Sequence, residues 1–195
     1  MNTHFAIKAR SQPLTAQQIA VVIGSMLGDG YLVKTTSGFA FRVNHSLKQK
    51  DYVMWKYKLL KDFSNSSPRQ SGTCFYFRTI THPTFVQMHN VFYRNGRKVI
   101  PKKLLAELLD DLVLAVWIMD DGSRDGMQIR INSQCFNKAE NEFLQKVLRT
   151  KLGIVTTLNR DKVYYRLRVA HQSMETIRTR VTPNLIPSMF YKLIP

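Results

Sequence analysis

The chain has 195 residues, of which 44% are hydrophobic and 11% aromatic, a composition that supports a folded core and excludes a disordered protein. Its formal net charge of +16 favours a polyanionic partner. Apolar runs stay shorter than the roughly 20 residues that span a bilayer, the start lacks a signal-peptide core, and the histidines and cysteines lack zinc-ligand spacing.

The first predicted helix begins at about Ala16, after a polar, basic lead-in over residues 1–15. Its apolar residues recur at the spacing of one helix face, namely Ile19, Val22, Ile23, Met26 and Leu27. The helix then runs into Asp29 and Gly30, and Gly30 suits the left-handed residue that closes a helix. An acid at this negative end of a helix costs roughly 0.3–1 kcal/mol. Asp29 is also one of only 3 acids in the first hundred residues, against 14 Lys and Arg.

The rest of the first half alternates short strands with helices. Alternation and turn residues predict strands over 31–34, 39–44 and 73–80, helices over 48–63 and 83–93, and a loop over 65–72. Ile100-Pro101 closes this half.

The second half repeats this order. An unbroken apolar run from Leu112 to Met119 predicts a helix that is buried all round and ends at Asp121-Gly122. Further elements are predicted over 127–132, 139–152, 154–158, 163–170 and 173–181, and Ile186-Pro187 closes the half. Matching landmarks recur at a nearly constant spacing of about 90 residues, which indicates an internal duplication.

The predicted fold is therefore α+β, with two pseudo-symmetric α-β-β-α-β-β-α repeats over 16–101 and 102–195. The helices that end at Asp29 and Asp121 are expected to pack on each other at the interface of the repeats. If they run side by side, both acids reach the same end, where a divalent cation would turn like-charge repulsion into coordination. A single Asp-Gly after a helix is more often a simple turn, but two in matching contexts favour a site.

The predicted strands carry apolar residues on one face and polar residues on the other. Met127, Ile129, Ile131 and Val163 are expected on the core side. A solvated sheet also has a polar face, yet this one is short of Glu, Asp and Thr and rich in residues that can read bases in a major groove. The candidate DNA-binding residues are Lys34, Arg42, Asn44, Tyr76, Arg78, Gln128, Arg130, Asn132, Arg166 and Arg168.

Four stretches together resemble the LAGLIDADG homing endonucleases, specifically the monomeric, two-motif, intron-encoded branch. They are Leu114 to Gly122, Asn132 to Gln134, Lys98 to Pro101 and Leu185 to Leu193, and the likeness extends from about Ala16 to Pro195. The first motif departs from the family pattern at Ser25 and Leu27, and Val116 replaces the packing glycine that Gly24 retains.

The resemblance implies roles for particular residues. Asp29 and Asp121 would be the metal-binding acids, and the carbonyls of Gly28 and Asp120 would be further ligands. Lys98 and Lys192 would stabilise charge in the transition state, although each could instead be one more phosphate contact. Gln134 would place a water, and its first-half counterpart falls at His45 or Ser46. The Asp120 side chain is expected to be solvated or to support a ligand.

The predicted function is a sequence-specific endonuclease that makes a staggered double-strand break in a long, asymmetric DNA site. Its cofactor would be Mg²⁺, as two or three divalent ions, with Mn²⁺ or Ca²⁺ substituting for binding. The expected partner is double-stranded DNA, bound by a monomer with no membrane contact, in the cytoplasm of a prokaryote or the matrix or stroma of an organelle. An RNA-binding maturase that assists splicing of its host intron remains an alternative, and a non-cutting regulator is a third.

Overall fold

The first half of the molecule forms the predicted α-β-β-α-β-β-α order after one additional helix. The structure is a computed structural model that describes residues 3–193, so the ends of the predicted lead-in and of the second repeat lie outside the described residues. In chain order the elements are α1 (His4–Ser11), α2 (Ala16–Leu27), β1 (Tyr31–Thr35), β2 (Gly38–Ser46), α3 (Lys50–Leu60), β3 (Arg69–Ser71), β4 (Cys74–Thr81) and α4 (Pro83–Phe92).

A linker and the second half follow. The linker holds a short hairpin of β5 (Tyr93–Arg94) and β6 (Arg97–Lys98), then α5 (Lys102–Leu108). The second half consists of α6 (Asp111–Asp121), β7 (Gly122–Asp125), β8 (Gln128–Ile131), α7 (Lys138–Leu152), β9 (Thr156–Asp161), β10 (Tyr164–Val169) and α8 (Met174–Val181). A 3-10 helix over Pro187–Lys192 then returns to pack against α3 and α6.

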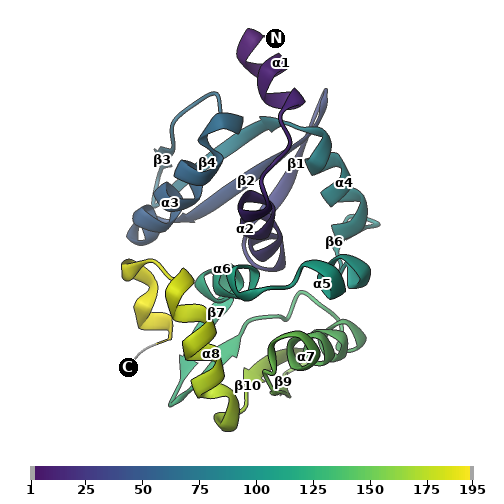
Figure 1. The fold of residues 1–195 in the computed structure, drawn as a ribbon, viewed down its shortest axis with the longest axis vertical. Coiled ribbons are helices and arrows are strands. Elements are labelled where there is room, and N and C mark those ends of the chain that lie inside the picture. The colour runs from purple at the N-terminus through teal and green to yellow at the C-terminus, as the bar shows by residue number, and fades with distance from the viewer. Residues whose placement is uncertain (1–2, 194–195) are drawn as a thin grey trace.

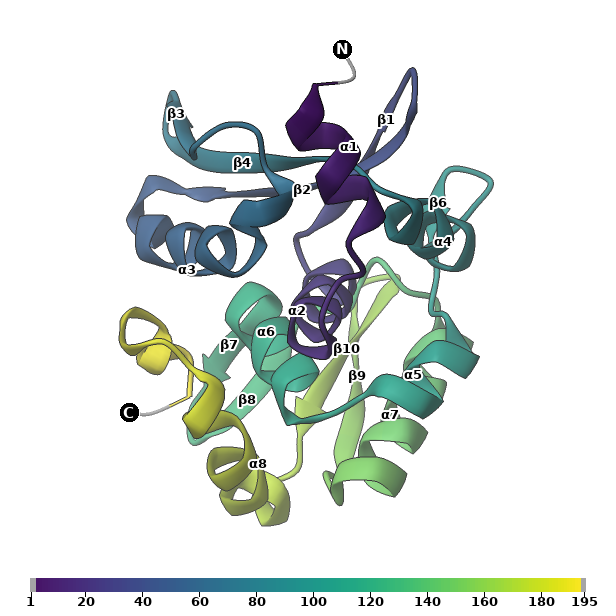
Figure 2. The same cartoon turned by 45° about the horizontal axis from the view of Figure 1, so that its top comes forward.

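Each half contains one antiparallel four-stranded sheet, in the matching orders β1-β2-β4-β3 and β7-β8-β10-β9. Figures 1 and 2 show the halves on either side of α2 and α6, which lie together at the centre. Helices α3 and α4 pack on the first sheet, and α7 packs on the second. The duplicated architecture has the form that the sequence predicts.

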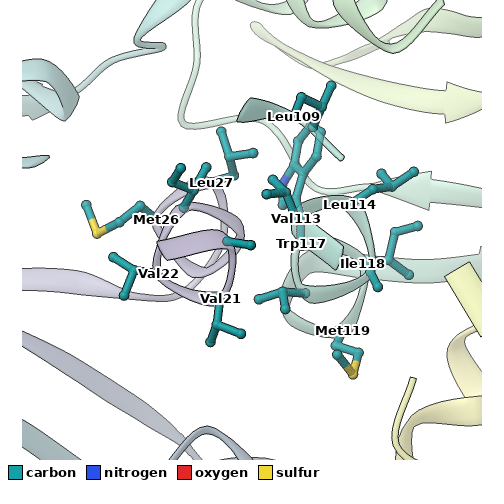
Figure 3. Packing of buried hydrophobic residues seen from close by; sticks show 14 of the residues in the cluster. Val21, Val22, Met26, Leu27, Leu109, Val113, Leu114, Trp117, Ile118 and Met119 are labelled. Carbon is teal, nitrogen blue, oxygen red and sulfur yellow. The ribbon is translucent and has the colours of Figure 1, made fainter. Parts of the chain in front are cut away.

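Helices α2 and α6 form the centre of the core. Thr15 and Gln18 make a capping box at the start of α2, and the Asp110 side chain accepts from Val113 N–H at the start of α6. Residues 113–119 of α6 are completely buried, as the unbroken apolar run predicts. Figure 3 looks nearly along both helices and shows apolar side chains extending from them in several directions.

Close backbone contact joins the two helices. A Cβ atom at Gly24 would lie 2.6 Å from the Val113 carbonyl oxygen and 2.7 Å from Val116 Cβ. Val116 therefore fills the space that Gly24 leaves open. Gly24 and Val116 thus form a complementary small–large pair across the helix interface, which explains why the second motif has valine where the first has glycine.

The glycines after the two motif acids do not have the predicted left-handed backbone. Gly122 has φ −70°, and Gly30 is absent from the positive-φ residues of the described chain. Both glycines are instead needed for close approach: a Cβ at Gly30 would lie 2.8 Å from Ser25 Cβ, and one at Gly122 would lie 2.5 Å from the Ile118 carbonyl oxygen. Gly122 caps α6 at the predicted position without the left-handed backbone, whereas α2 ends at Leu27 with Gly28 as its C-cap, so the prediction that Gly30 closes its helix was wrong.

Other differences from the sequence prediction lie at the ends of elements. Residues 4–11 form a helix with Ala6 and Ala9 buried, and the predicted loop 65–72 contains β3. Met127 and Val163, expected in the core, are 71% and 74% exposed because they lie in the turns before β8 and β10. A polar–apolar alternation extended past the true strand end assigns the turn residue to the wrong face.

Candidate active site

The C-terminal ends of α2 and α6 meet at the centre of the molecule. The backbone N–H of Asp29 donates to Asp120 Oδ2 at 3.2 Å, so the acidic ends of both motif helices lie at the same place. This is the juxtaposition that the duplicated motif predicts. Asp29 and Asp121 therefore lie near enough for the Asp29 carboxylate to raise the pKa of Asp121.

The surroundings of Asp29 and Asp121 disfavour negative charge. Burial, together with the Asp29 and Asp120 carboxylates, raises the pKa of Asp121 to about 8, against the opposing effect of Lys98 and Lys192. Partial burial and the Asp120 carboxylate also raise the pKa of Asp29, whose side chain is 50% exposed. A bound cation would stabilise both groups as carboxylates. The donor set therefore fits a divalent metal ion.

Lys98 and Lys192 point at the ends of the motif helices. Lys98 Nζ donates to the carbonyl oxygens of Gly28 at 2.8 Å and Gly30 at 2.9 Å, while Lys192 Nζ donates to the Asp120 carbonyl oxygen at 2.8 Å. The Gly28 and Asp120 carbonyls are the predicted main-chain ligands, and each oxygen has a second lone pair. Burial lowers the pKa of both lysines, while the nearby carboxylates oppose that shift.

The Asp120 side chain is buried, so of the two expectations for it the solvated one is wrong, and the one in which it supports a ligand residue stays. Its Oδ1 accepts from Lys56 Nζ at 2.7 Å and from the Tyr52 hydroxyl at 2.7 Å. The side chains of Asp120 and Lys56 are both 0% exposed. Asp120 is buried because it lies on the face of α6 that contacts α2 and α3. Its side chain points to those helices, and its main-chain carbonyl oxygen accepts from Lys192.

His45, and not Ser46, lies beside the first acid. Its Nδ1 is 3.6 Å from Asp29 Oδ2 and its Nε2 is 3.6 Å from Asp120 Oδ1. Burial lowers its pKa to about 4, helped by the Lys56 ammonium, so the ring is neutral at pH 7. Ser46 is exposed and accepts from the Lys48 N–H. The structure thus favours His45 as the first-half counterpart of Gln134.

Gln134 itself lies near Asp161 on β9, whose pKa is lowered mainly by Arg166 and also by the Gln134 amide. The next residue, Cys135, lies near Lys98 and Asp121, and burial raises the pKa of its thiol to about 11. Placement of a water by Gln134 stays a prediction that requires this amide to reorient.

The site lacks a preformed protein cage for a metal. Within residues 3–193, no three His, Cys, Asp or Glu side chains are grouped as ligands. Mg²⁺ commonly uses one or two carboxylates, keeps several waters and takes its remaining ligands from substrate phosphates. Two carboxylates with neighbouring carbonyls fit an ion that is completed by a phosphodiester.

The outer face of the first sheet carries most of its predicted DNA-binding residues. Strand register places Arg42 opposite both Tyr31 and Arg78, and Asn44 opposite Tyr76. The Arg42 guanidinium lies 4.6 Å from the centre of the Tyr76 ring. Lys34 differs, because alternation along β1 puts it on the side of buried Leu32.

The outer face of the second sheet brings together Gln128, Arg130, Asn132, Arg166 and Arg168. It is not short of acids, however. Asp125 Oδ2 lies 2.8 Å from Arg130 Nη2 and 3.0 Å from Arg168 Nε. Asp161 pairs with Arg166, which also donates to Asn132 Oδ1 at 3.4 Å, and Gln128 donates to the Val169 carbonyl at 2.7 Å. The predicted polar face is present, but its arginines have acidic partners.

Sequence reasoning did not identify Lys56 and Tyr52 as site residues. Both are completely buried on α3, one helical turn apart. The available signal was a lysine on the stripe that begins at Tyr52, since a lysine is almost never fully buried unless it is paired. Its partner could not be identified, because Asp120 is distant in the sequence.

No helix within residues 3–193 has the length and apolar character that a membrane crossing requires.

Comparisons with known proteins agree with this geometry. The pattern of the family described as "LAGLIDADG DNA endonuclease family" matches residues 19–177. A curated relative, "Cytochrome b mRNA maturase bI2" of Debaryomyces hansenii, is 27% identical over 94% of this chain and 76% of that protein. The chain spans about half the length of other curated relatives that it matches.

Solved structures share the fold. "The homing endonuclease I-WcaI bound to its DNA recognition sequence" superimposes with a TM-score of 0.89, at 23% identity over 99% of this chain and 93% of that one. "The crystal structure of I-DmoI in complex with DNA and Mn" gives a TM-score of 0.59, at 15% identity over 88% of this chain and 99% of that one. These likenesses confirm the predicted α+β architecture.

Proposed function

Because the chain belongs to the LAGLIDADG DNA endonuclease family, as its motifs predict, we propose that it is a sequence-specific homing endonuclease. It would make a staggered double-strand break in a long, asymmetric DNA target by metal-dependent phosphodiester hydrolysis. The observation that carries this proposal is the meeting of Asp29 and Asp121 at one end of α2 and α6, with an ammonium group at each helix end.

The acids and lysines have complementary roles in the proposed reaction. Asp29 and Asp121, with the carbonyls of Gly28 and Asp120, would hold two or three Mg²⁺ ions, which supply an activated water and neutralise the phosphate. Lys98 and Lys192 supply fixed positive charge where the transition state gains negative charge. The solved I-DmoI complexes with DNA and Mn or Ca support the use of divalent ions.

Water placement would fall to different residues in the two half-sites. His45, neutral and buried, can exchange a hydrogen bond with a water beside Asp29. Gln134 would serve the Asp121 side after leaving Asp161. Unequal partners at the two acids would give the two strands different cleavage rates.

The outer faces of the two sheets would bind double-stranded DNA. Arg42, Arg78, Arg130, Arg166 and Arg168 line these faces on either side of the paired acids. We propose that the protein acts as a monomer, since both acids come from one chain. Its compartment would be the cytoplasm of a prokaryote or the matrix or stroma of an organelle.

Asp-to-Asn substitutions test the assignment of the acids. In Asp29→Asn or Asp121→Asn, linearisation of a plasmid that carries the target should fall by more than about 10³-fold, because a metal-binding carboxylate is lost. The joined sequences that flank the gene provide the target to be tested first. Binding of the same DNA, measured by mobility shift, should persist.

Asp62→Asn is the matched control, because Asp62 is an exposed acid outside the site. Its cleavage rate should equal that of the wild type. Cleavage that survives both substitutions at Asp29 and Asp121 would reject these residues as the metal-binding pair.

A second candidate function is an RNA-binding maturase that assists splicing of a host intron. The observation in its favour is the match to a protein named as an mRNA maturase over 94% of this chain. Stimulation of intron splicing in vitro, unchanged in Asp29→Asn, would establish this activity as separate from cleavage. Mg²⁺-dependent linearisation of a target plasmid without any effect on splicing would leave the endonuclease alone.

A further inference from the structure

A buried polar cluster lies directly beneath the first acid of the site. Lys56 Nζ and the Tyr52 hydroxyl each lie 2.7 Å from Asp120 Oδ1, while Asp120 Oδ2 accepts from the Asp29 N–H at 3.2 Å. The Lys56 ammonium also lies 4.2 Å from the centre of the Tyr52 ring. One carboxylate therefore connects a lysine on α3 to the main chain of Asp29.

The contact is possible because the two motifs differ at one position. Asp120 precedes Asp121, and its counterpart before Asp29 is Gly28. A Cβ at Gly28 would lie 2.4 Å from Asp120 Cβ and 2.9 Å from Asp120 Oδ2. The Asp120 side chain therefore occupies the space above Gly28, and the two residues form a complementary pair across the pseudo-twofold axis.

Up to residue 193, where the described chain ends, the second half has no equivalent cluster. Helix α7, which corresponds to α3, buries Glu140, Asn141, Leu144, Val147, Leu148 and Leu152 among its residues, and none of these is a lysine. Buried Asn141 bonds Ser133, and Glu140 bonds Arg97 and caps its own helix. The polar residues of α7 thus support the loop and linker of that half.

Stability alone does not require these charges. A buried ion pair loses solvation on folding, and its replacement by apolar residues of similar volume is often neutral or stabilising. A pair that also fixes the backbone N–H of a metal-binding residue has a geometric role that an apolar pair cannot take over.

We propose that Lys56 is a positioning residue for the first half-site: through Asp120 it holds the main chain of Asp29 in place, whereas Asp121 lies in the last turn of α6 and its carbonyl accepts from the Asn132 N–H at 3.0 Å. The inference rests on the proposed endonuclease function. The first half-site then depends on a contact between α3 and α6, and loss of that contact slows the cut made there more than the other cut.

The test replaces the ion pair as a unit. In Lys56→Met/Asp120→Leu both charges leave together, the length of the lysine side chain and the branched outline of the aspartate are approximately kept, and the main-chain carbonyl of residue 120 remains for Lys192. Tyr52 retains the Val116 carbonyl, 3.2 Å away, as an acceptor. The single variants leave one buried charge unpaired and should unfold at lower temperature, while the double variant should recover the thermal midpoint. Lys58→Met, at an exposed position of the same helix, is the matched control.

The first readout does not depend on activity. Amide hydrogen exchange at Asp29, followed by NMR, should be at least tenfold faster in the double variant than in the wild type and in Lys58→Met, because its acceptor is gone. Exchange in the middle of α2 should be unchanged. Unchanged exchange at Asp29 would overturn the proposal.

The second readout separates the two strands. With a supercoiled target plasmid and Mg²⁺, the double variant should accumulate nicked circles, always cut in the same strand, with the second cut delayed at least tenfold. Equal slowing of both cuts would also overturn the positioning role. If the wild type itself fails to cut, the endonuclease proposal fails, while the exchange readout still decides whether the pair holds Asp29.

Discussion

His82 caps the N-terminus of α4 as a neutral imidazole. Its Nδ1 accepts from the Thr84 N–H at 3.1 Å, so the proton is on Nε2, which lies 3.0 Å from the Gln12 carbonyl oxygen. Burial lowers the pKa of this ring below the ordinary value of 6.5, with the Gln12 bond opposing the shift. Protonation of Nδ1 would remove the cap.

The stability that neutral His82 provides should depend on pH. Because the pKa is lower in the folded protein, the contribution is complete above about pH 6.5 and is lost as the pH falls through the lower folded-state value. In His82→Asn, a side chain that also caps helices, this dependence should disappear. The difference in urea midpoint between the wild type and the variant should therefore shrink from pH 8 to pH 5.5.

The matched control for this comparison is His171→Asn, at an exposed histidine. Its urea midpoint should differ from that of the wild type by the same amount at both pH values. A difference for His82→Asn that is constant with pH would show that protonation of His82 does not affect folding.

At the residue scale, the sequence predicted those site residues that belong to a recognisable short motif. The motif places Asp29 and Asp121, and the Ile-Pro and C-terminal stretches place Lys98 and Lys192, all of which the structure brings to one point. The pairing of Lys56 with Asp120 joins residues 64 positions apart. Such a contact follows from how α3 packs on α6, which no local pattern specifies.

At the scale of elements, helix α2 packs closely on α6. In Gly24→Ala the new methyl would meet Val116 Cβ at 2.7 Å and the Val113 carbonyl oxygen at 2.6 Å. Overpacking of this kind costs about 1–3 kcal/mol. We expect Gly24→Ala to lower the free energy of unfolding by that amount in urea denaturation.

The same substitution in a Val116→Ala background provides the control. Val116→Ala keeps Cβ but removes Cγ1, which would lie 2.9 Å from the new methyl, so Gly24→Ala should cost less there, with a coupling of at least about 0.5 kcal/mol between the two sites. Equal costs in both backgrounds would show that the helices separate rather than press on Val116. The acids at the ends of these helices would then also move apart.

Element prediction succeeded where a segment is long and periodic. Helices α2, α4, α6 and α7 begin and end within about two residues of the predicted bounds. The unpredicted strands are short: β3 has 3 residues, β5 and β6 have 2 each, and β7 has 4. Strands of this length are set by pairing with a neighbour, as β7 is by β8, and leave little pattern in the sequence.

At the scale of the whole molecule, charge is distributed unequally between the halves. Residues 1–100 contain 14 Lys and Arg against 3 acids, and residues 101–195 contain 15 against 10. The structure carries this difference onto the sheet faces, where Asp125 and Asp161 pair with Arg130, Arg166 and Arg168. The first sheet should therefore contribute more to the electrostatic part of DNA binding.

A matched pair of arginine substitutions tests this asymmetry in the inactive Asp29→Asn protein. Among the described residues no carboxylate pairs with Arg42, which instead stacks on Tyr76, so all of its charge is available to DNA. Arg166 must give up or share Asp161 and Asn132 to make an equivalent contact. Arg42→Ala should weaken target binding by about 1–3 kcal/mol and reduce the slope of log K against log salt by about 1, both more than Arg166→Ala does.

Fluorescence anisotropy over 50–200 mM salt measures both the affinity and the slope, with exposed Arg149→Ala on α7 as the control. A larger loss for Arg166→Ala would mean that the acids orient the second-half arginines toward DNA and do not neutralise them.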